Sequence, residues 1–268
     1  MTDDPHDTTP DLLVNRVSPQ PSDVDADGLQ TSLTDLAALV TGAHRLSELL
    51  VQVAIYAANA IPGADGAGVT LLHVDRVDNR VEALAASHPF VAEIDEIQYK
   101  TVNEGPCITA ALTRRTVRSG SLGGEKLWPH FGPRVGRLGI HSALSLPLLL
   151  PGQVVGAINV YARGKDVFGD HAQHLGELFA APAAVAVHNA HTLSQALALT
   201  HQLQMAMTTR PVIDEAVGLI RGRTGATSQE ARGRLREMSQ RDHVKLIEVA
   251  QHLVDEAVRR ARARHADS

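Results

Sequence analysis

The chain contains 268 residues, the length of one large domain or two ordinary ones. Its 44% hydrophobic and 21% charged residues are typical of a folded globular protein, and its formal net charge of −5 excludes the overall basicity of a chain that coats nucleic acid. The charge is uneven, however. Residues 196–268 carry 12 basic and 9 acidic side chains, against 13 and 21 in the rest of the chain, so a mildly basic C-terminal module follows an acidic body.

A single cysteine, Cys107, excludes an intrachain disulfide and a multi-cysteine zinc site, and it fits a reducing compartment. Residues 1–7 have neither the basic nor the apolar region of a signal peptide. The longest apolar run, residues 180–187, is too short to span a membrane. We therefore expect a cytoplasmic protein that has no membrane partner.

The first two thirds of the chain predict an antiparallel sheet between helices. Residues 1–30 hold seven Asp, four Pro and one Arg, which predicts a disordered acidic tail. A helical repeat follows over 32–61 and ends at Pro62. The remaining elements are two hairpins and shorter segments: strands at 66–74 and 81–86, short helices within 88–113, a strand at 116–119, a helix or loop at 128–135, and strands at 141–150 and 153–163. Consecutive hairpins flanked by helices indicate an α+β fold.

Residues 169–207 again have a helical pattern, which Pro182 is expected to break. Within it lies an apolar stripe at steps of three and four residues: Leu193, Leu197, Thr200, Leu203 and Met207. Such a stripe suits the seam of a dimeric coiled coil, and it suits packing onto the chain's own domain equally well.

Three short helices are predicted at the C-terminal end. The first starts near Pro211 and ends at Gly225, the second starts at the capping box Thr227–Glu230, and the third starts near Asp242. Their predicted inward residues are Ile213, Ala216, Val217 and Ile220, then Ala231, Leu235 and Met238, then Leu246, Ala250, Leu253 and Ala257. Because about 45 residues form only a small core, this module should depend on the preceding helix or on a dimer partner.

No catalytic signature is present: the sequence lacks H-E-x-x-H, G-x-S-x-G, Walker A and dinucleotide-binding glycine motifs. His188 and His191 lie three residues apart on a predicted helix, but no third ligand accompanies them. We therefore predict a protein that is not an enzyme and has no catalytic residues, metal or cofactor.

The C-terminal segment carries a recognisable succession of motifs. AMTTRPVIDEAVGLI (206–220) is followed in order by TSQEA (227–231), LREMSQ (235–240) and KLIEVA (245–250). This succession resembles the ANTAR domain, an RNA-binding module of transcription antitermination regulators.

A second set of motifs precedes it: EGPC (104–107), LWPHF (127–131), HSALSLPL (141–148) and GAINVY (156–161). These resemble a GAF sensor domain of the type that precedes ANTAR in actinobacterial regulators. The two resemblances, the composition of the tail and the apolar stripe together predict four parts: a disordered acidic tail at 1–30, a GAF domain at 31–190, a coiled-coil linker helix at 191–210 and an ANTAR domain at 211–268.

The resemblance implies a signal-responsive regulator that binds tandem RNA stem-loops, as a homodimer, and responds to an unidentified small molecule. Residues 196–268 contain no Phe, Tyr or Trp, so bases cannot stack on aromatic rings there, and recognition must use Arg, Lys and His beside small residues. The candidate RNA-binding residues are Ala216, Gly218, Arg223, Ser239, Gln240, Arg241 and Lys245. The candidate residues of the sensor pocket are Cys107, Trp128, His130, His141 and Tyr161.

Three positions depart from the ANTAR pattern: Arg221 stands where Met is usual, Arg232 where an aromatic is usual, and Val244 where a basic residue is common. The two arginines would either add phosphate contacts or loosen the core. The alternatives are a DNA-binding regulator, a small-molecule or redox sensor whose C-terminal module serves only dimerisation, and a reductase that uses Cys107. The lack of a second cysteine argues against the reductase.

Overall fold

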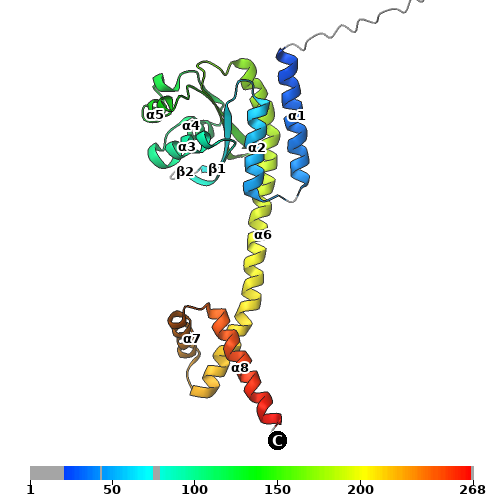
Figure 1. Ribbon diagram of the computed structural model, residues 1–268, viewed down its shortest axis with the longest axis vertical. Helices are drawn as coiled ribbons and strands as arrows, with labels where there is room; N and C mark the ends of the chain where they lie inside the picture. Colours follow the sequence, from blue (N-terminus) through cyan, green and yellow to red (C-terminus); the bar gives the residue numbers. More distant parts are fainter. Residues whose placement is uncertain (1–20, 43, 75–78, 267–268) are drawn as a thin grey trace, which may run out of the picture. The chain divides into compact units, whose positions relative to one another are not determined.

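The computed structural model describes residues 21–42, 44–74 and 79–266. The chain divides into two compact units, Met1–Thr192 and Leu193–Ser268. One long helix, α6 (Asp170–Thr224), belongs to both: it contributes its first part to unit 1 and the rest to unit 2 (Figure 1). No described helix is long and apolar enough to cross a membrane.

Unit 1 is built on a five-stranded sheet in the order β2-β1-β5-β4-β3, in which every neighbouring pair is antiparallel. The strands are β1 (Gly66–Val74), β2 (Asn79–Ala86), β3 (Val117–Ser119), β4 (Ser142–Leu150) and β5 (Gln153–Ala162). Both predicted hairpins, β1–β2 and β4–β5, are confirmed, and with them the α+β fold.

Helices cover the two faces of the sheet unequally (Figure 1). On one side lie α1 (Pro21–Thr41), α2 (Leu46–Ala60) and the first part of α6, which share a continuous apolar core with the strands. On the other side lie shorter elements: α3 (Pro89–Glu96), the π-helical turn η1 (Ile97–Val102), α4 (Pro106–Thr113), the 3₁₀ turn η2 (Leu122–Gly124) and α5 (Phe131–Arg137).

The N-terminal helices differ from the prediction. The segment predicted as one helix forms two, α1 and α2, and α1 begins at Pro21, inside the predicted disordered tail. Leu29, Leu36 and Leu39 of α1 are buried in the core of unit 1, so tertiary packing stabilises a helix that the acidic composition disfavours. Residues 1–20 of the predicted tail lie outside the described residues.

The break predicted at Pro182 and the start predicted at Pro211 are both absent, because α6 is continuous through both prolines. A proline inside a helix removes one backbone hydrogen bond and costs about 3 kcal/mol. Beside Pro182, the side chains of Phe179, Ala183 and Val187 are fully buried, and their packing offsets this cost.

Unit 2 consists of the end of α6 together with α7 (Ser228–Asp242) and α8 (Leu246–Ala266). The Thr227–Glu230 capping box and the left-handed Gly225 (φ +69°) are confirmed. The third helix begins at Leu246, not near Asp242, because His243 adopts a left-handed conformation that ends α7. The core is small: Ala216, Val217, Ala231, Leu235, Val249, Ala250 and Val254.

Candidate functional site

The two faces of the sheet differ in polarity. Cross-strand partners share a face, so the register places Asn159 of β5 and Ser145 of β4 beside Gly68 of β1. Tyr161 lies opposite Gly66 on this same face. The alternating residues of these strands lie in the apolar core on the other side, among them Val69, Leu144, Ile158 and Val160. The polar face is the one that α3, η1, α4 and α5 cover.

Four side chains on or beside this polar face form what we call the buried polar cluster: Asp95, Gln98, Asn159 and Tyr161. Both carboxyl oxygens of Asp95, the amide nitrogens of Gln98 and Asn159, and the Tyr161 hydroxyl are buried and have no hydrogen-bond partner within the described part of the chain. Buried polar atoms are nearly always paired in folded proteins. Four such groups in one region therefore indicate a binding site.

The two amide groups of the cluster have defined orientations. Gln98 Oε1 accepts the backbone N–H of Cys107 at 3.2 Å, and Asn159 Oδ1 accepts the Ser145 hydroxyl at 2.8 Å. Because each oxygen is already bonded, each NH₂ group is left as a donor. The cluster thus offers two amide donors, one phenol hydroxyl and one carboxyl group.

Asp95 reaches the sheet from α3. A Cβ atom added at Gly68 would lie only 2.9 Å from Asp95 Oδ2, so the glycine leaves the space that the carboxyl group occupies. Burial raises the pKa of Asp95 to about 8, because ionisation would place a charge away from water. The carboxyl group therefore keeps its proton at neutral pH.

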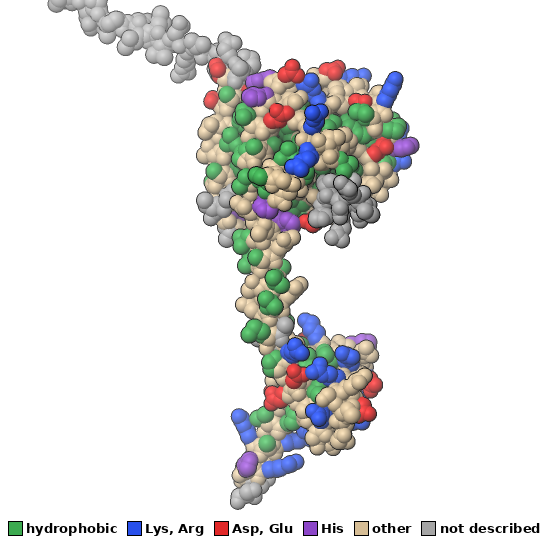
Figure 2. Space-filling view, turned by 180° about the vertical axis from the view of Figure 1, so that it is seen from behind, with side chains coloured by type: hydrophobic (Ala, Val, Ile, Leu, Met, Phe, Trp, Pro, Cys, Tyr) green, Lys and Arg blue, Asp and Glu red, His purple; other side chains and the backbone are tan. Residues whose placement is uncertain are grey.

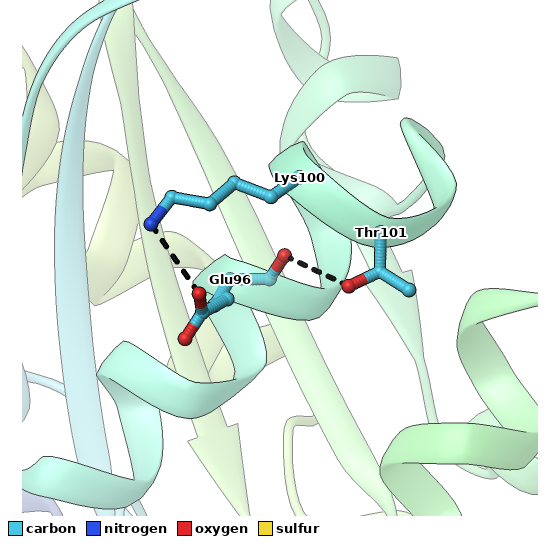
Figure 3. A network of polar contacts seen from close by, with 3 residues as sticks. All are labelled: Glu96, Lys100 and Thr101. Carbon is cyan, nitrogen blue, oxygen red and sulfur yellow. Dashed lines mark hydrogen bonds and ion pairs between the residues drawn. The ribbon is translucent and has the colours of Figure 1, made fainter.

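The π-helical turn η1 positions the cluster from the helical side. Thr101 Oγ1 donates to the carbonyl oxygen of Glu96, five residues earlier, at 3.4 Å, and Lys100 Nζ lies 3.3 Å from Glu96 Oε1 (Figure 3). These three residues are exposed, whereas Asp95 and Gln98 are buried. Single π-turns are frequent at functional sites, and here the turn holds Gln98 while Asp95 lies in the preceding helix α3.

Cys107 lies beside the cluster in a protonated state. The Tyr99 hydroxyl is 3.0 Å from Thr70 Oγ1 and also within hydrogen-bond distance of Cys107 Sγ. The thiol is fully buried, and burial raises its pKa to about 12. A thiol that keeps its proton is a poor nucleophile. The region is therefore suited to non-covalent binding.

Three of the predicted pocket residues lie in this region. Cys107 and Tyr161 are fully buried there. Trp128 is 2% exposed, its indole N–H donates to Thr109 Oγ1 at 3.0 Å, and it belongs to the same apolar group as Tyr161.

The two predicted histidines lie elsewhere. His130 is exposed, and the Glu104 carboxylate accepts the backbone N–H groups of His130 and Phe131 at the start of α5. His141 is half-buried and precedes β4, where its backbone bonds to Ala162 and Leu122. Their backbones thus organise loops around the sheet.

The sequence prediction missed Asp95, Gln98 and Asn159. A signal was present for two of them. Asn159 interrupts the otherwise apolar strand GAINVY, and Asp95 follows Val91 by four residues, on the side of α3 that faces inward. Gln98 gave no signal, because its inward direction depends on the π-turn.

Unit 2 presents the second candidate site, a basic surface. Figure 2 shows Lys and Arg side chains over this unit. All twelve of its basic residues are exposed. Arg223 and Lys245 have no ion-pair partner among residues 21–266 as far as they are described, whereas Arg241 pairs with Asp242 at 2.7 Å. Unpaired exposed cations of this kind suit contacts to phosphate groups.

The remaining predicted RNA-binding residues have different surroundings. Ala216 is fully buried in the core of unit 2, so its side chain does not reach the surface. Gln240 is exposed, and Ser239 is half-buried and donates to the carbonyl oxygen of Val244 at 2.6 Å. Gly218 is exposed on α6, and a Cβ added there would meet nothing within 4 Å.

Two family models match the chain: a GAF domain over residues 43–188 and an ANTAR domain over residues 201–254. The chain belongs to the GAF domain family and carries an ANTAR domain. GAF domains are sensors and ANTAR domains are RNA-binding antitermination modules, so the architecture is that of a signal-responsive regulator. Among curated proteins, no sequence matches the chain significantly.

Several solved structures are similar to the GAF domain at low sequence identity. The GAF domain of a phosphoenolpyruvate-protein phosphotransferase from Coxiella burnetii is 17% identical, with a TM-score of 0.49, covering 63% of this chain and 98% of its own. The corresponding Acinetobacter domain is 14% identical, with a TM-score of 0.47 and coverages of 64% and 97%. The free methionine-R-sulfoxide reductase of Neisseria meningitidis is 12% identical, with a TM-score of 0.47 and coverages of 66% and 95%.

The arginines that depart from the ANTAR pattern lie on the surface of the ANTAR domain. Arg232 of α7 pairs with Asp214 of α6 at 2.6 Å, with both side chains about half exposed, and Arg221 is exposed. Neither arginine replaces a core residue, because the core forms from other positions. The departures therefore leave the small core intact.

Proposed function

We propose that the chain is an RNA-binding transcription antitermination regulator. Its ANTAR domain binds tandem RNA stem-loops, and its GAF domain responds to a small molecule. We assign the GAF sensor to residues 31–190, the linker to 191–210 and the RNA-binding module to 211–268, in a cytoplasmic protein.

The observation that carries this proposal is the surroundings of Gly218. A glycine inside a helix costs about 1 kcal/mol relative to alanine. Close packing against another helix would explain it, but a Cβ at this position would meet nothing within 4 Å. The surface of α6 at Gly218 is therefore smooth and open, and it lies on a unit rich in exposed arginine. This combination favours close backbone approach of a partner such as a looped nucleotide.

Dimerisation completes the proposal. The predicted stripe on α6 is exposed in the single chain, with Leu193 at 59%, Leu197 at 61%, Leu203 at 57% and Met207 at 75%. Exposed leucines at steps of three and four residues suit the seam of a coiled coil between two copies. A dimer also places two basic modules on one assembly, which matches a tandem pair of stem-loops.

Filter binding of the full chain to a tandem stem-loop RNA tests the proposal. We expect the RNA to bind more tightly than duplex DNA of equal length and charge. Lys245→Ala should weaken RNA binding about tenfold, because the exposed ammonium contributes a charge-assisted contact. Lys165→Ala, which removes an exposed lysine from the GAF domain, is the matched control and should have no effect.

Preferential binding of duplex DNA would favour the alternative of a DNA-binding regulator. If the wild type, Lys245→Ala and Lys165→Ala all bound any RNA equally and in a salt-sensitive way, specific recognition would be contradicted. The reductase alternative has little support, because the only cysteine, Cys107, is a buried thiol with a pKa of about 12.

A further inference from the structure

Asp95 is the only acidic or basic side chain that is buried in the described part of the structure, and it is protonated in the free protein near pH 7. The other buried polar side chains are uncharged: Ser32, Thr70, Gln98, Ser119, Ser142, Ser145 and Asn159. A phosphate or carboxylate bound at the buried polar cluster would find no buried cation to compensate its charge, and an uncompensated buried charge is strongly destabilising. The charge of a bound ammonium group, in contrast, can be compensated when Asp95 loses its proton. A buried site with one ionisable acid and no basic side chain therefore disfavours an anionic ligand and favours a cationic one.

The unpaired polar atoms of the buried polar cluster indicate which hydrogen-bonding groups the ligand carries. Gln98 Nε2 and Asn159 Nδ2 are donors, and both Asp95 oxygens lack a partner. A matching molecule carries a donor for Asp95 and an acceptor oxygen for the amides. A bare metal ion does not match, because two amide N–H groups would point their positive ends toward it.

An apolar surface adjoins these polar atoms. Tyr161 belongs to one buried group with Val91, Ile94, Trp128 and Phe131, which line the helical side of the same region. An organic body can lie against such a surface, whereas a hydrated inorganic ion cannot.

We propose that the buried polar cluster binds a small organic monocation, whose ammonium group donates to Asp95 and whose carbonyl or hydroxyl oxygen accepts from Gln98 and Asn159. This inference rests on the proposal that the GAF domain senses a small molecule, and it names the chemical class of that molecule.

Binding of such a cation releases a proton. Three other titratable groups lie close enough to Asp95 to interact with it electrostatically: Tyr99 on η1, Cys107 on α4 and Tyr161 on β5. Burial raises the pKa of all three, so they stay neutral near pH 7. Asp95 is protonated in the free protein, and an ammonium group in contact with it stabilises the ionised form.

Calorimetric titration of the full chain tests the proposal with three isosteric probes: β-alaninamide, which is a cation, 3-hydroxypropanamide, which is uncharged, and 3-hydroxypropanoate, which is an anion. The longer cation 5-aminopentanamide extends the series. We expect a cation to bind about tenfold more tightly than the uncharged probe. We also expect the anion to give no binding heat, and titrations in two buffers of different ionisation enthalpy to reveal release of about one proton at pH 7.

Asp95→Asn, a neutral isostere of the protonated acid, should abolish the preference for the cation. The matched control is Glu93→Gln, which removes an exposed carboxylate from the same helix and should change nothing. Four results would each overturn the proposal. The anion could bind at least as tightly as the cation, or Asp95→Asn could bind the cation as well as the wild type does. Cation binding could release no proton, or neither cation could bind. The proton-release measurement needs no variant and so does not depend on the stability of one.

RNA filter binding is measured in parallel. Cation binding that leaves RNA affinity unchanged would contradict only the regulatory link between the domains. RNA binding by a protein that binds no cation would contradict only the ligand assignment.

Discussion

The Asp95 carboxyl group occupies the space that a side chain at Gly68 would fill. A Cβ at position 68 would lie 2.9 Å from Asp95 Oδ2 and 3.0 Å from Val91 Cγ1, and both neighbours are buried. Helix α3 can therefore bring its acid onto strand β1 only where that strand carries a glycine.

Gly68→Ala should destabilise the protein by about 1–3 kcal/mol, because added atoms in a packed interior force neighbours out of place. Urea unfolding measures this change. Gly169→Ala is the control, since a Cβ there would meet nothing within 4 Å. Adding Asp95→Ala to the Gly68 variant should restore part of the loss. Equal stability of the two glycine variants would contradict the contact.

Asp95 should make stability depend on pH. Its folded pKa of about 8 lies above the ordinary aspartate value of 3.8, so the folded state binds the proton more tightly than the unfolded state. This contribution is fully present below about pH 4 and is lost as pH rises through about 8. The thermal midpoint should fall over this range in the wild type and less steeply in Asp95→Asn, which should be the more stable protein at pH 8. If the thermal midpoints of the wild type and of Asp95→Asn changed equally with pH, Asp95 would not have the buried environment described above.

Much of the fold could be predicted from the sequence. Alternating apolar residues between turn residues predicted the hairpins at 66–86 and 141–163, and the capping box at Thr227 predicted the start of α7. These signals act between residues close in sequence. The helix over 21–30 and the passage of α6 through Pro182 were not predictable in this way, because distant core residues stabilise both.

The residues of the candidate site in the GAF domain divide in the same way. Tyr161 and Cys107 were predicted from motifs of the GAF resemblance, whereas Asp95 and Gln98 lie on no motif. Their importance follows from burial without a partner, a property that exists only once η1 packs against the sheet.

The stripe on α6 makes a testable prediction about assembly. Leu197→Glu should convert a dimer into a monomer, because it places a charge in the coiled-coil seam. Ala198→Glu is the matched control: Ala198 is exposed on the same helix and lies at least about 100° around it from every residue of the stripe. Sedimentation equilibrium distinguishes the two states. Dimers that tolerate Leu197→Glu as well as Ala198→Glu would contradict the proposed seam.

Alanine substitutions at two glycines of α6 distinguish an effect on helix stability from an effect on RNA affinity. Gly218→Ala and Gly222→Ala should each stabilise the helix by about 0.5–1 kcal/mol, since neither added Cβ meets a neighbour within 4 Å. Only Gly218→Ala should weaken RNA binding, because its Cβ would hold the RNA backbone away. Chemical unfolding and filter binding measure the two effects. An equal loss of affinity in both variants, or in neither, would show that Gly218 has no special role.

The most direct test of the proposed function is single-round transcription through a terminator whose leader RNA carries tandem stem-loops. We expect the wild-type chain to increase read-through, and Lys165→Ala to do so equally. Lys245→Ala should leave read-through near the protein-free level. Read-through that does not respond to the wild-type chain, or that Lys245→Ala raises as strongly, would contradict antitermination through the ANTAR surface.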